Sequence, residues 1–521
     1  MRARATWFLL LGLALPGHAG DRPVSAPFEI DTVAPPVNVI DRHVRAELER
    51  RGIEPARRCS DEVFVRRVYI DVIGTLPRPA EVLAFLADRR PDKRARLIEA
   101  LLERDEFADY WSLKWSDVLR VKAEFPINLW PNAVQAYYRW IHDCIRLNRP
   151  YDRMARALLT ESGSNFREPA VNFWRAMPSK EPAALAQGVA LTFMGVRLDR
   201  WPEERREQFA TLFSRVAFKR TIEWKEEIVF VDPAPVRSLR TVLPDGTRLR
   251  VLPDVDPRVA FADWLIRRDN PWFAPCAVNR VWAWLMGRGI VHEPDDFRPD
   301  NPPSNPDLLA ALSRELVVSG YDLRHVYRLI LNSATYQQSS ISRSRDPAAE
   351  ARFAHFIVRR LDAEVLIDAI CLITGTHEKY VSPIPEPFTF LPEFERTITL
   401  ADGSITSPFL EMFGRPTRDS GLWSERNSAS TGAQRLHLLN SSDIRNRIRS
   451  SPRLAAFTRT ARKQPGQAVR DLYLLILSRP PTPAEQRVIW VYSRTRRIRG
   501  RALGEDLIWA LINSKEFLYA H

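Results

Sequence analysis

The chain has 521 residues, of which 45% are hydrophobic and 15 are tryptophan, so it is long enough for two or three domains with substantial cores. Its net charge of +13 raises the question of an anionic partner such as nucleic acid. The arginines, however, are interleaved with acids, as in residues 42–50, and no basic run or base-stacking motif supports nucleic acid. Composition therefore argues against a nucleic-acid partner and leaves an anionic polysaccharide or envelope surface open.

The first residues have the pattern of an export signal. Arg2 and Arg4 precede an apolar segment, residues 7–15, and small residues follow before position 20. This pattern predicts a signal peptide over residues 1–19 that is cleaved near Ala19. The apolar segment is too short to cross a bilayer, and no later segment is apolar enough to do so. We therefore predict a periplasmic or extracellular protein.

Residues 20–40 contain prolines and little periodicity, which predicts a linker, and residues 41–218 are predicted to form an N-terminal helical domain. Apolar residues there recur at helical spacing. Helices are expected over residues 61–73, 92–102, 105–121, 133–147, 151–159 and 182–194. The aromatic stripe at Tyr110, Trp111 and Trp115 is more typical of a core than of a cofactor site.

The middle of the chain carries the β-strand signal. Residues 227–231 and 247–251 are rich in apolar and β-branched side chains, and an Asp-Gly pair before the second segment is typical of a hairpin turn. We therefore predict a β connector over residues 219–256. Helices are expected to resume in a C-terminal domain, residues 257–521, with Asp256 as the first helix cap. The predicted fold class is mainly α, with two helical domains joined by a small β-hairpin connector.

One segment of the chain has an internal counterpart. Residues 69–81 align without gaps to residues 473–485. In the second copy Thr482 can cap a helix, Pro483 fits its first turn and Glu485 completes a capping box. Each copy is therefore predicted to be a helix, a proline-stiffened turn and a second helix. The two explanations are convergence on one stable corner, which the lack of a longer period favours, and duplication.

The four cysteines, Cys59, Cys144, Cys276 and Cys371, lie far apart in the sequence. No two of them form a CxxC pair, so neither a zinc knuckle nor covalent haem attachment is predicted, and we expect no cofactor and no metal. In an oxidising compartment they could form one or two disulfides. Because each has apolar neighbours, buried free cysteines are an equally good interpretation.

Candidate chemistry is concentrated on polar loops of the C-terminal domain. Residues 292–298 collect a histidine and several acids, and a later loop carries more charges. Such residues could bind a hard cation or do acid–base work on a glycan, but helix caps and ion pairs are the favoured interpretation because their spacing matches no calcium loop. No fingerprint of a serine hydrolase, metalloprotease, P-loop or dinucleotide-binding protein is present. The candidate binding residues are Arg288, Asp295, Asp296, Arg298, Arg415, Glu425 and Arg426.

Motifs along nearly the whole chain resemble those of one protein family. They include residues 66–71, 114–115, 270–273, 278–282, 287–291, 295–298, 301–304, 319–323 and 331–336. The chain is similar to a two-domain family of secreted proteins of unknown function that is abundant in planctomycetes and their relatives. The N-terminal domain is named for its association with planctomycete c-type cytochromes, and the two domains carry domain-of-unknown-function numbers fifteen-forty-nine and fifteen-fifty-three. The resemblance implies ancestry and compartment but no reaction.

The chain departs from this family at two cysteine sites. Relatives typically have a CxxCH motif where this chain has residues 199–204, and many have cysteines where it has residues 420–424. Because CxxCH can attach haem or hold another metal, we expect no covalent haem here. The two sites either served one redox or metal centre that has been lost, or formed disulfides that packing around Trp201 and Trp423 has replaced. In the first case Trp201 and Trp423 should be neighbours, in a cleft shared with the candidate residues at the domain junction.

Three functions are compatible with the sequence. The preferred one is a noncatalytic binding protein associated with the envelope or with a polysaccharide, on a fold that has lost a cysteine site. The alternatives are an enzyme acting on polysaccharide, and a subunit of an extracytoplasmic redox complex whose cofactor sits on a partner. The missing cysteines weigh against the redox complex, and the lack of a catalytic signature weighs against the enzyme.

Overall fold

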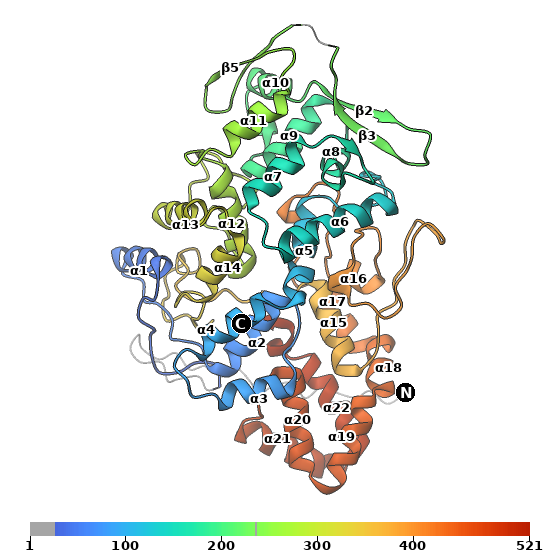
Figure 1. The fold of residues 1–521 in the computed structure, drawn as a ribbon. Coiled ribbons are helices and arrows are strands. Elements are labelled where there is room, and N and C mark those ends of the chain that lie inside the picture. Colours follow the sequence, from blue (N-terminus) through green and yellow to red (C-terminus); the bar gives the residue numbers. More distant parts are fainter. Residues whose placement is uncertain (1–26, 235–236) are drawn as a thin grey trace.

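The computed structural model describes residues 27–234 and 237–521, so the predicted signal peptide and the first part of the linker lie outside the described residues. The fold is mainly α, as predicted, with 53% of the residues in helices. Figure 1 shows an elongated molecule with the β connector at one end and the last helices of the chain at the other. Among the described residues, no helix combines the length and apolar character needed to cross a membrane.

The N-terminal part is built from short helices that follow the predicted segments. They are α1 (Val39–Arg51), α2 (Asp61–Ile73), α3 (Pro79–Ala87), α4 (Lys93–Leu102), α5 (Asp105–Val118), α6 (Pro131–Arg146), α7 (Tyr151–Thr160), α8 (Asn172–Arg175), α9 (Pro182–Met194) and α10 (Glu203–Thr211), with 3-10 turns η1 (Pro169–Val171) and η2 (Leu198–Arg200). Helix α2 ends at Gly74 in a left-handed conformation, as glycine allows. Helix α5 ends before the predicted residue 121 because Arg120 also takes a left-handed conformation, with φ 57°.

The predicted connector holds two small hairpins where we expected one. Strands β2 (Val216–Arg220) and β3 (Glu227–Val231) pair antiparallel, and β1 (Gly163–Ser164) pairs with the other edge of β3. Strands β4 (Leu239–Val242) and β5 (Arg248–Val251) form the second hairpin across the Asp-Gly turn. Each predicted strand therefore pairs with a nearer neighbour in sequence, which costs less loop-closure entropy than pairing β3 with β5.

The C-terminal part resumes with helices, and Asp256 caps the first of them by accepting from the backbone N–H of Arg258 at 2.8 Å. The helices are α11 (Pro257–Leu265), α12 (Phe273–Met286), α13 (Pro306–Val318), α14 (Leu323–Leu331), α15 (Ala363–Thr374), α16 (Pro408–Met412), α17 (Gly432–Asn440), α18 (Ser442–Ser450), α19 (Pro452–Lys463), α20 (Pro465–Leu477), α21 (Pro483–Arg496), α22 (Gly500–Ile512) and α23 (Lys515–Leu518). The short elements are η3 (Thr397–Thr399), η4 (Trp423–Glu425) and the paired strands β6 (Arg359–Arg360) and β7 (Tyr519–Ala520).

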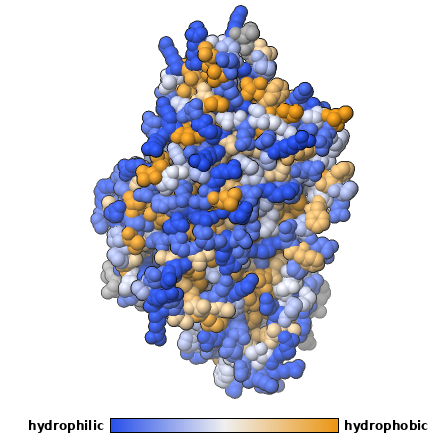
Figure 2. Space-filling view, in the orientation of Figure 1, coloured by the Kyte–Doolittle hydropathy of each residue, from blue (hydrophilic) through white to orange (hydrophobic). Residues whose placement is uncertain are grey.

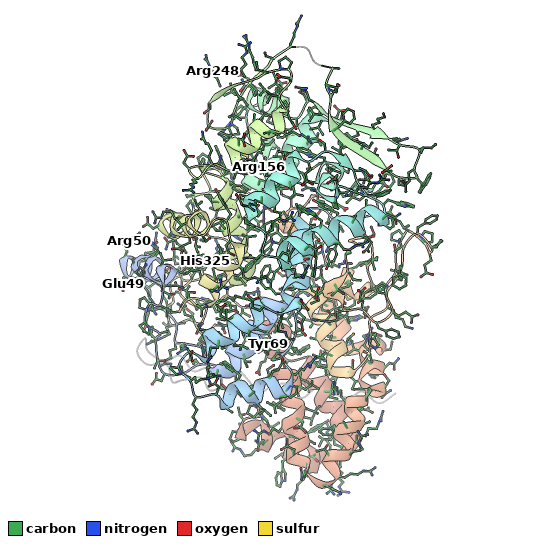
Figure 3. All side chains as sticks on the ribbon, in the orientation of Figure 1. Glu49, Arg50, Tyr69, Arg156, Arg248 and His325 are labelled. Atoms are coloured by element: carbon green, nitrogen blue, oxygen red, sulfur yellow. The ribbon has the colours of Figure 1, made fainter. Side chains whose placement is uncertain are left out.

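The two helical parts share one hydrophobic core. A continuous cluster of buried side chains runs from Ile40 to Ala520. Helix α1 packs against α13, α7 against α11, α9 against α12, and α3 against α20. The predicted stripe on α5 belongs to this core, since Trp111 and Trp115 are almost fully buried. Glu49 and Arg50 lie on the outer face of α1, and Figure 3 shows them at the edge of the molecule, whereas Glu47 is buried.

The four cysteines are free. Cys59, Cys144 and Cys276 are buried and Cys371 is half-buried. Burial raises the pKa of Cys144 and of Cys371 to about 12, so both thiols stay protonated and unreactive near neutral pH. The structure therefore agrees with the packing interpretation rather than with disulfides.

The two matching segments adopt the same structure. Helices α2 and α20 both end at a residue in the left-handed conformation, Gly74 with φ 59° and Ser478 with φ 57°. At the start of α3 and α21, which follow, the equivalent acids Glu81 and Glu485 accept from the backbone N–H of Arg78 and of Thr482, each at 2.7 Å, and in α21 Thr482 completes the capping box. The predicted corner of helix, turn and helix is therefore present twice.

The match continues into the next helix pair. Residues 97–107 align with residues 507–517 and are identical at 6 of 11 positions. In the first copy Arg104 pairs with Glu81 and Glu106 and lies over the ring of Tyr69. In the second copy a different arginine, Arg479, makes the same contacts. It pairs with the equivalent acids Glu485 and Glu516 and lies over the ring of the equivalent tyrosine, Tyr473. A match over four helices favours duplication over convergence.

Candidate functional site

Arg415 and Arg426 lie in a buried network of charges where the two parts meet. Arg426 donates to Glu364 and to Asp117, each at 2.7 Å, and Arg415 lies 3.6 Å from Glu364. Arg418 donates to the other oxygen of Asp117 at 2.9 Å. An acid on α5 and an acid on α15 therefore hold three arginines of the loop that follows α16.

Burial and pairing set the charge states in this network. Burial lowers the pKa of Arg426, but Asp117 and Glu364 outweigh it and raise that pKa well above its ordinary value. Burial would raise the pKa of Asp117, but Arg426 and Arg418 outweigh it and keep that pKa low. Burial, followed by the charge of Arg418, lowers the pKa of Arg415 to about 10. Arg426, Asp117 and Arg415 therefore stay charged near neutral pH, so the network suits a structural role better than acid–base catalysis.

Two more buried acids extend the network toward α2, and the sequence did not single them out. Asp362 accepts from Lys114 on α5, and Asp71 accepts from Arg359. The hydroxyl of Tyr336 also donates to Asp71 at 2.8 Å. In each case one partner comes from the N-terminal helices and the other from the C-terminal part. The network is therefore a charged seam that joins the two parts.

Asp295 and Glu425 hold the loop of residues 419–425. Asp295 accepts from Arg280 at 3.2 Å and from the backbone N–H of Trp423. Glu425 accepts from the backbone N–H groups of residues 419 and 420 at 3.1 and 2.7 Å. Both acids therefore cap backbone N–H groups, and Asp295 is also an ion-pair partner, which is one of the alternatives that the sequence left open.

Asp296, Arg298 and Arg288 lie apart from these groups. Arg298 pairs at the surface with Asp296 and Asp300, both at 3.1 Å. Arg288 is half-buried, and its charge adds to burial in lowering the pKa of His292. The structure thus brings Arg415 to Arg426, and Asp295 to the loop of Glu425, and it leaves the other three predicted residues elsewhere.

Residues 199–204 and 420–424, where the family resemblance implies cysteines, lie near the C-terminal end of α9. Arg280, the partner of Asp295, also donates to the carbonyl of Thr192 at 2.9 Å. The backbone N–H of Phe297 donates to the carbonyl of Gly195 at 2.9 Å. The loop of residues 419–425, which Asp295 holds, and the segment that follows α9 therefore lie around one helix end.

A surface pocket of about 310 Å³ lies beside the segment that follows α9. It is lined by Ala183, Gln187, Leu198, Asp199, Glu203, Arg206, Glu207 and Ala210, and none of the seven predicted residues is among them. Trp201 packs on Phe209, with ring centroids 6.0 Å apart, and the Arg205 guanidinium lies over the Trp201 ring, 3.8 Å from its centroid. Within the described ranges, no group of three or more His, Cys, Asp or Glu residues is arranged to hold a metal ion.

An exposed aromatic cluster lies outside all of the predicted sites. The ring of Trp130 is 6.3 Å from that of Trp224 and 5.5 Å from that of Phe388. The Lys225 ammonium lies 4.8 Å from the Trp130 ring and 5.5 Å from the Trp224 ring. Trp224 is 70% exposed and Phe388 is 53% exposed. Figure 2 shows hydrophobic residues along this edge of the molecule, at the tip of the β2–β3 hairpin and below it.

The cluster is held in a fixed geometry. Trp130 has φ 74°, a conformation that costs a non-glycine residue free energy and persists where the surroundings impose it, often at functional sites. The loop before it is bound by the C-terminal part, because Asp402 accepts from the backbone N–H of Ala123 at 2.9 Å and Ser404 accepts from that of Glu124 at 2.8 Å. One feature of the sequence could have pointed to this cluster. Trp224 lies in a hairpin turn, where polar residues are usual.

Two family models match the chain. Residues 39–199 match PSCyt2, described as a protein of unknown function (DUF1549), and residues 257–492 match PSD1, described as a protein of unknown function (DUF1553). No curated protein and no solved structure matches the chain. The two matched segments flank the β connector.

Proposed function

The chain belongs to the two-domain family that joins a PSCyt2 domain to a PSD1 domain, and we propose that it is a noncatalytic envelope protein that binds polysaccharide. Both family descriptions leave function open, so the proposal rests on one observation, the exposed cluster of Trp130, Trp224 and Phe388. The proposal places the protein outside the cytoplasm, in the periplasm or beyond, because residues 1–19 have the pattern of a signal peptide.

Aromatic rings that face water suit sugar rings. The C–H faces of a pyranose stack on an aromatic face, and exposed apolar patches commonly mark binding sites. Phe125 and Phe390, on the two loops that supply Trp130 and Phe388, are themselves 69% and 80% exposed. Lys225 adds a donor for sugar hydroxyl or carboxylate groups.

The ring orientations narrow the ligand class. The planes of Trp130 and Trp224 differ by 82°, and those of Trp130 and Phe388 differ by 57°. Rings that stack on a flat crystalline polysaccharide would need to be nearly coplanar. The tilted arrangement fits a single hydrated polysaccharide chain that bends between the rings.

The proposal includes the loss of a cysteine centre and the absence of catalysis. The segments that replace the cysteines of relatives lie around the end of α9, which supports a former shared centre. The acids and arginines that could have done chemistry are instead paired with one another in the charged seam. A binding role therefore accounts for the surface and for the buried charges.

Affinity electrophoresis through gels that contain xylan, glucomannan, dextran or alginate tests this function. We expect at least one polymer to retard the protein, and Trp224→Ala to weaken the binding by about tenfold, since a stacked ring contributes on the order of 1 kcal/mol. Trp490→Ala, which removes a 57% exposed tryptophan at the other end of the molecule, is the matched control and should bind normally. The proposal is wrong if no polymer retards the parent protein. It is also wrong if Trp224→Ala and Trp490→Ala are retarded equally. Release of reducing ends would contradict the noncatalytic part alone.

A further inference from the structure

Positive charge is concentrated in the last helices of the chain. Residues 442–521 contain 16 arginines and lysines and 6 acids, a net charge of +10 out of +13 for the whole chain. Between Glu485 and Glu505 there are 6 arginines and no acid, so the interleaving seen on α1 does not extend to this segment. Figure 1 places α19–α22 at the end of the molecule opposite the connector.

Helix α21 is the outermost element of this region. None of its residues is buried. Its inner side carries Ile489, which packs against the core, and Glu485, which pairs with Arg479 at 2.8 Å. Its outer side carries Val488 and Val491, one helical turn apart, which are 68% and 52% exposed, and Trp490, which is 57% exposed.

The first copy of the repeat forms the same helix corner without the apolar side chains and arginines found on the outer side of α21. The counterpart of α21 is α3, which has 9 residues against 14 and buries Val82 and Phe85. The alignment of the repeat places Val488 and Val491 opposite Ala84 and Ala87. The extension of α21 and the residues after it carry Arg494, Arg496, Arg497 and Arg499. The second copy has therefore added apolar side chains and arginines on a face that the corner does not use.

We propose that α21 and the arginines that follow it dock on an anionic phospholipid membrane surface. Aliphatic and aromatic side chains on an exposed helix gain free energy by entering the boundary between headgroups and acyl chains, and arginines beside them pair with phosphate groups. An acidic polysaccharide would attract the arginines but offers no apolar layer for Val488 and Val491. This inference is independent of the polysaccharide proposal, because it uses the opposite end of the molecule.

Sedimentation of the full mature chain with phosphatidylglycerol vesicles tests the docking. We expect binding at low salt that falls at 0.5 M salt, and binding to phosphatidylcholine vesicles that is weaker by about tenfold or more. The triple variant Arg494→Gln/Arg496→Gln/Arg497→Gln and the double variant Val488→Ser/Val491→Ser should each weaken binding to the anionic vesicles by about tenfold or more.

The controls are Arg139→Gln and Val318→Ser, which change exposed residues outside the C-terminal helices and should bind normally. Circular dichroism melting curves of all variants should match that of the parent, because the changed side chains are exposed. Failure of the parent to bind anionic vesicles would falsify the proposal. Loss of binding in the arginine variant together with full binding in the valine variant would also overturn it, since that outcome indicates recognition of any polyanion.

Discussion

Arg426 and Arg298 show how the role of a polar loop residue depends on partners that are distant in sequence. Both belong to charged motifs of the C-terminal part, and the neighbouring residues in the sequence do not show which of them is buried. Arg426 is enclosed by Asp117 and by Glu364, whereas Arg298 reaches only near neighbours such as Asp296 at the surface. Arg426 therefore stabilises the tertiary structure, whereas Arg298 only forms an ion pair at the surface.

Replacing these two arginines with methionine should have unequal effects on stability. Arg426→Met leaves Asp117 and Glu364 buried without a main partner, so we expect the free energy of unfolding to fall by about 3–5 kcal/mol. Arg298→Met should change it by less than about 1 kcal/mol, because exposed ion pairs contribute little. Urea unfolding followed by tryptophan fluorescence measures both variants. Similar losses in the two would show that the buried network is not a special source of stability.

At the scale of elements, the sequence predicts what is encoded locally. The bounds of α2 and α9 follow from their caps and closing glycines, and the capping box of α21 follows from Thr482 and Glu485. Strand pairing in the connector was less predictable, because the four-residue strand β4 has almost no pattern of its own. For the candidate site, ion-pair partners such as Asp117 lie on other elements, so sequence proximity could not reveal them.

The aromatic cluster was missed for a related reason. Helical periodicity identifies the buried face for Trp111 and Trp115 on α5. Trp224 lies in a turn between two strands, where no period separates an inner from an outer face. Its neighbours Trp130 and Phe388 come from segments far away in the chain, so only the three-dimensional structure brings them together.

The two copies of the helix corner give opposite predictions for exchanging glycine and serine at the same backbone position. Ser478→Gly should raise the free energy of unfolding by about 1 kcal/mol, because it relieves a left-handed serine whose buried hydroxyl has no partner in the structure. Gly74→Ser should lower it by about 1–3 kcal/mol, because a Cβ atom there would lie 2.6 Å from the Tyr110 ring. Thermal or urea unfolding measures both. The reverse order of stabilities would show that the copies do not share this conformational constraint.

At the scale of the whole molecule, the two family domains behave as one packing unit. Arg66 on α2 donates to the carbonyls of Ile476 and Phe517 at 2.8 and 2.9 Å, and Arg67 donates to that of His521 at 2.9 Å. Strand β7 also pairs with β6. Because these contacts are buried and cross the whole length of the sequence, we expect a single cooperative unfolding transition.

Removing residues 515–521 tests this unity. The truncated chain loses the partners of Arg66 and Arg67 at the C-terminal end, so the amide protons of α2 should exchange at least about tenfold faster although the deletion lies far away in sequence. Hydrogen exchange followed by mass spectrometry reports on residues 61–73. Lys515→Ala, a change at an exposed position in the same segment, should leave that exchange unaltered. Unchanged protection of α2 in the truncated chain would mean that the N-terminal part is stable by itself.

The contacts of Arg66 and Arg67 also set an order of events in time. Both side chains are almost fully buried, and their partners at Phe517 and His521 are synthesised 451 and 454 residues after Arg66 and Arg67 themselves. A growing chain therefore lacks these two contacts of α2 until residues 517–521 have been made. The same contacts that join the finished molecule therefore make the packing of α2 depend on the part of the chain that is synthesised last.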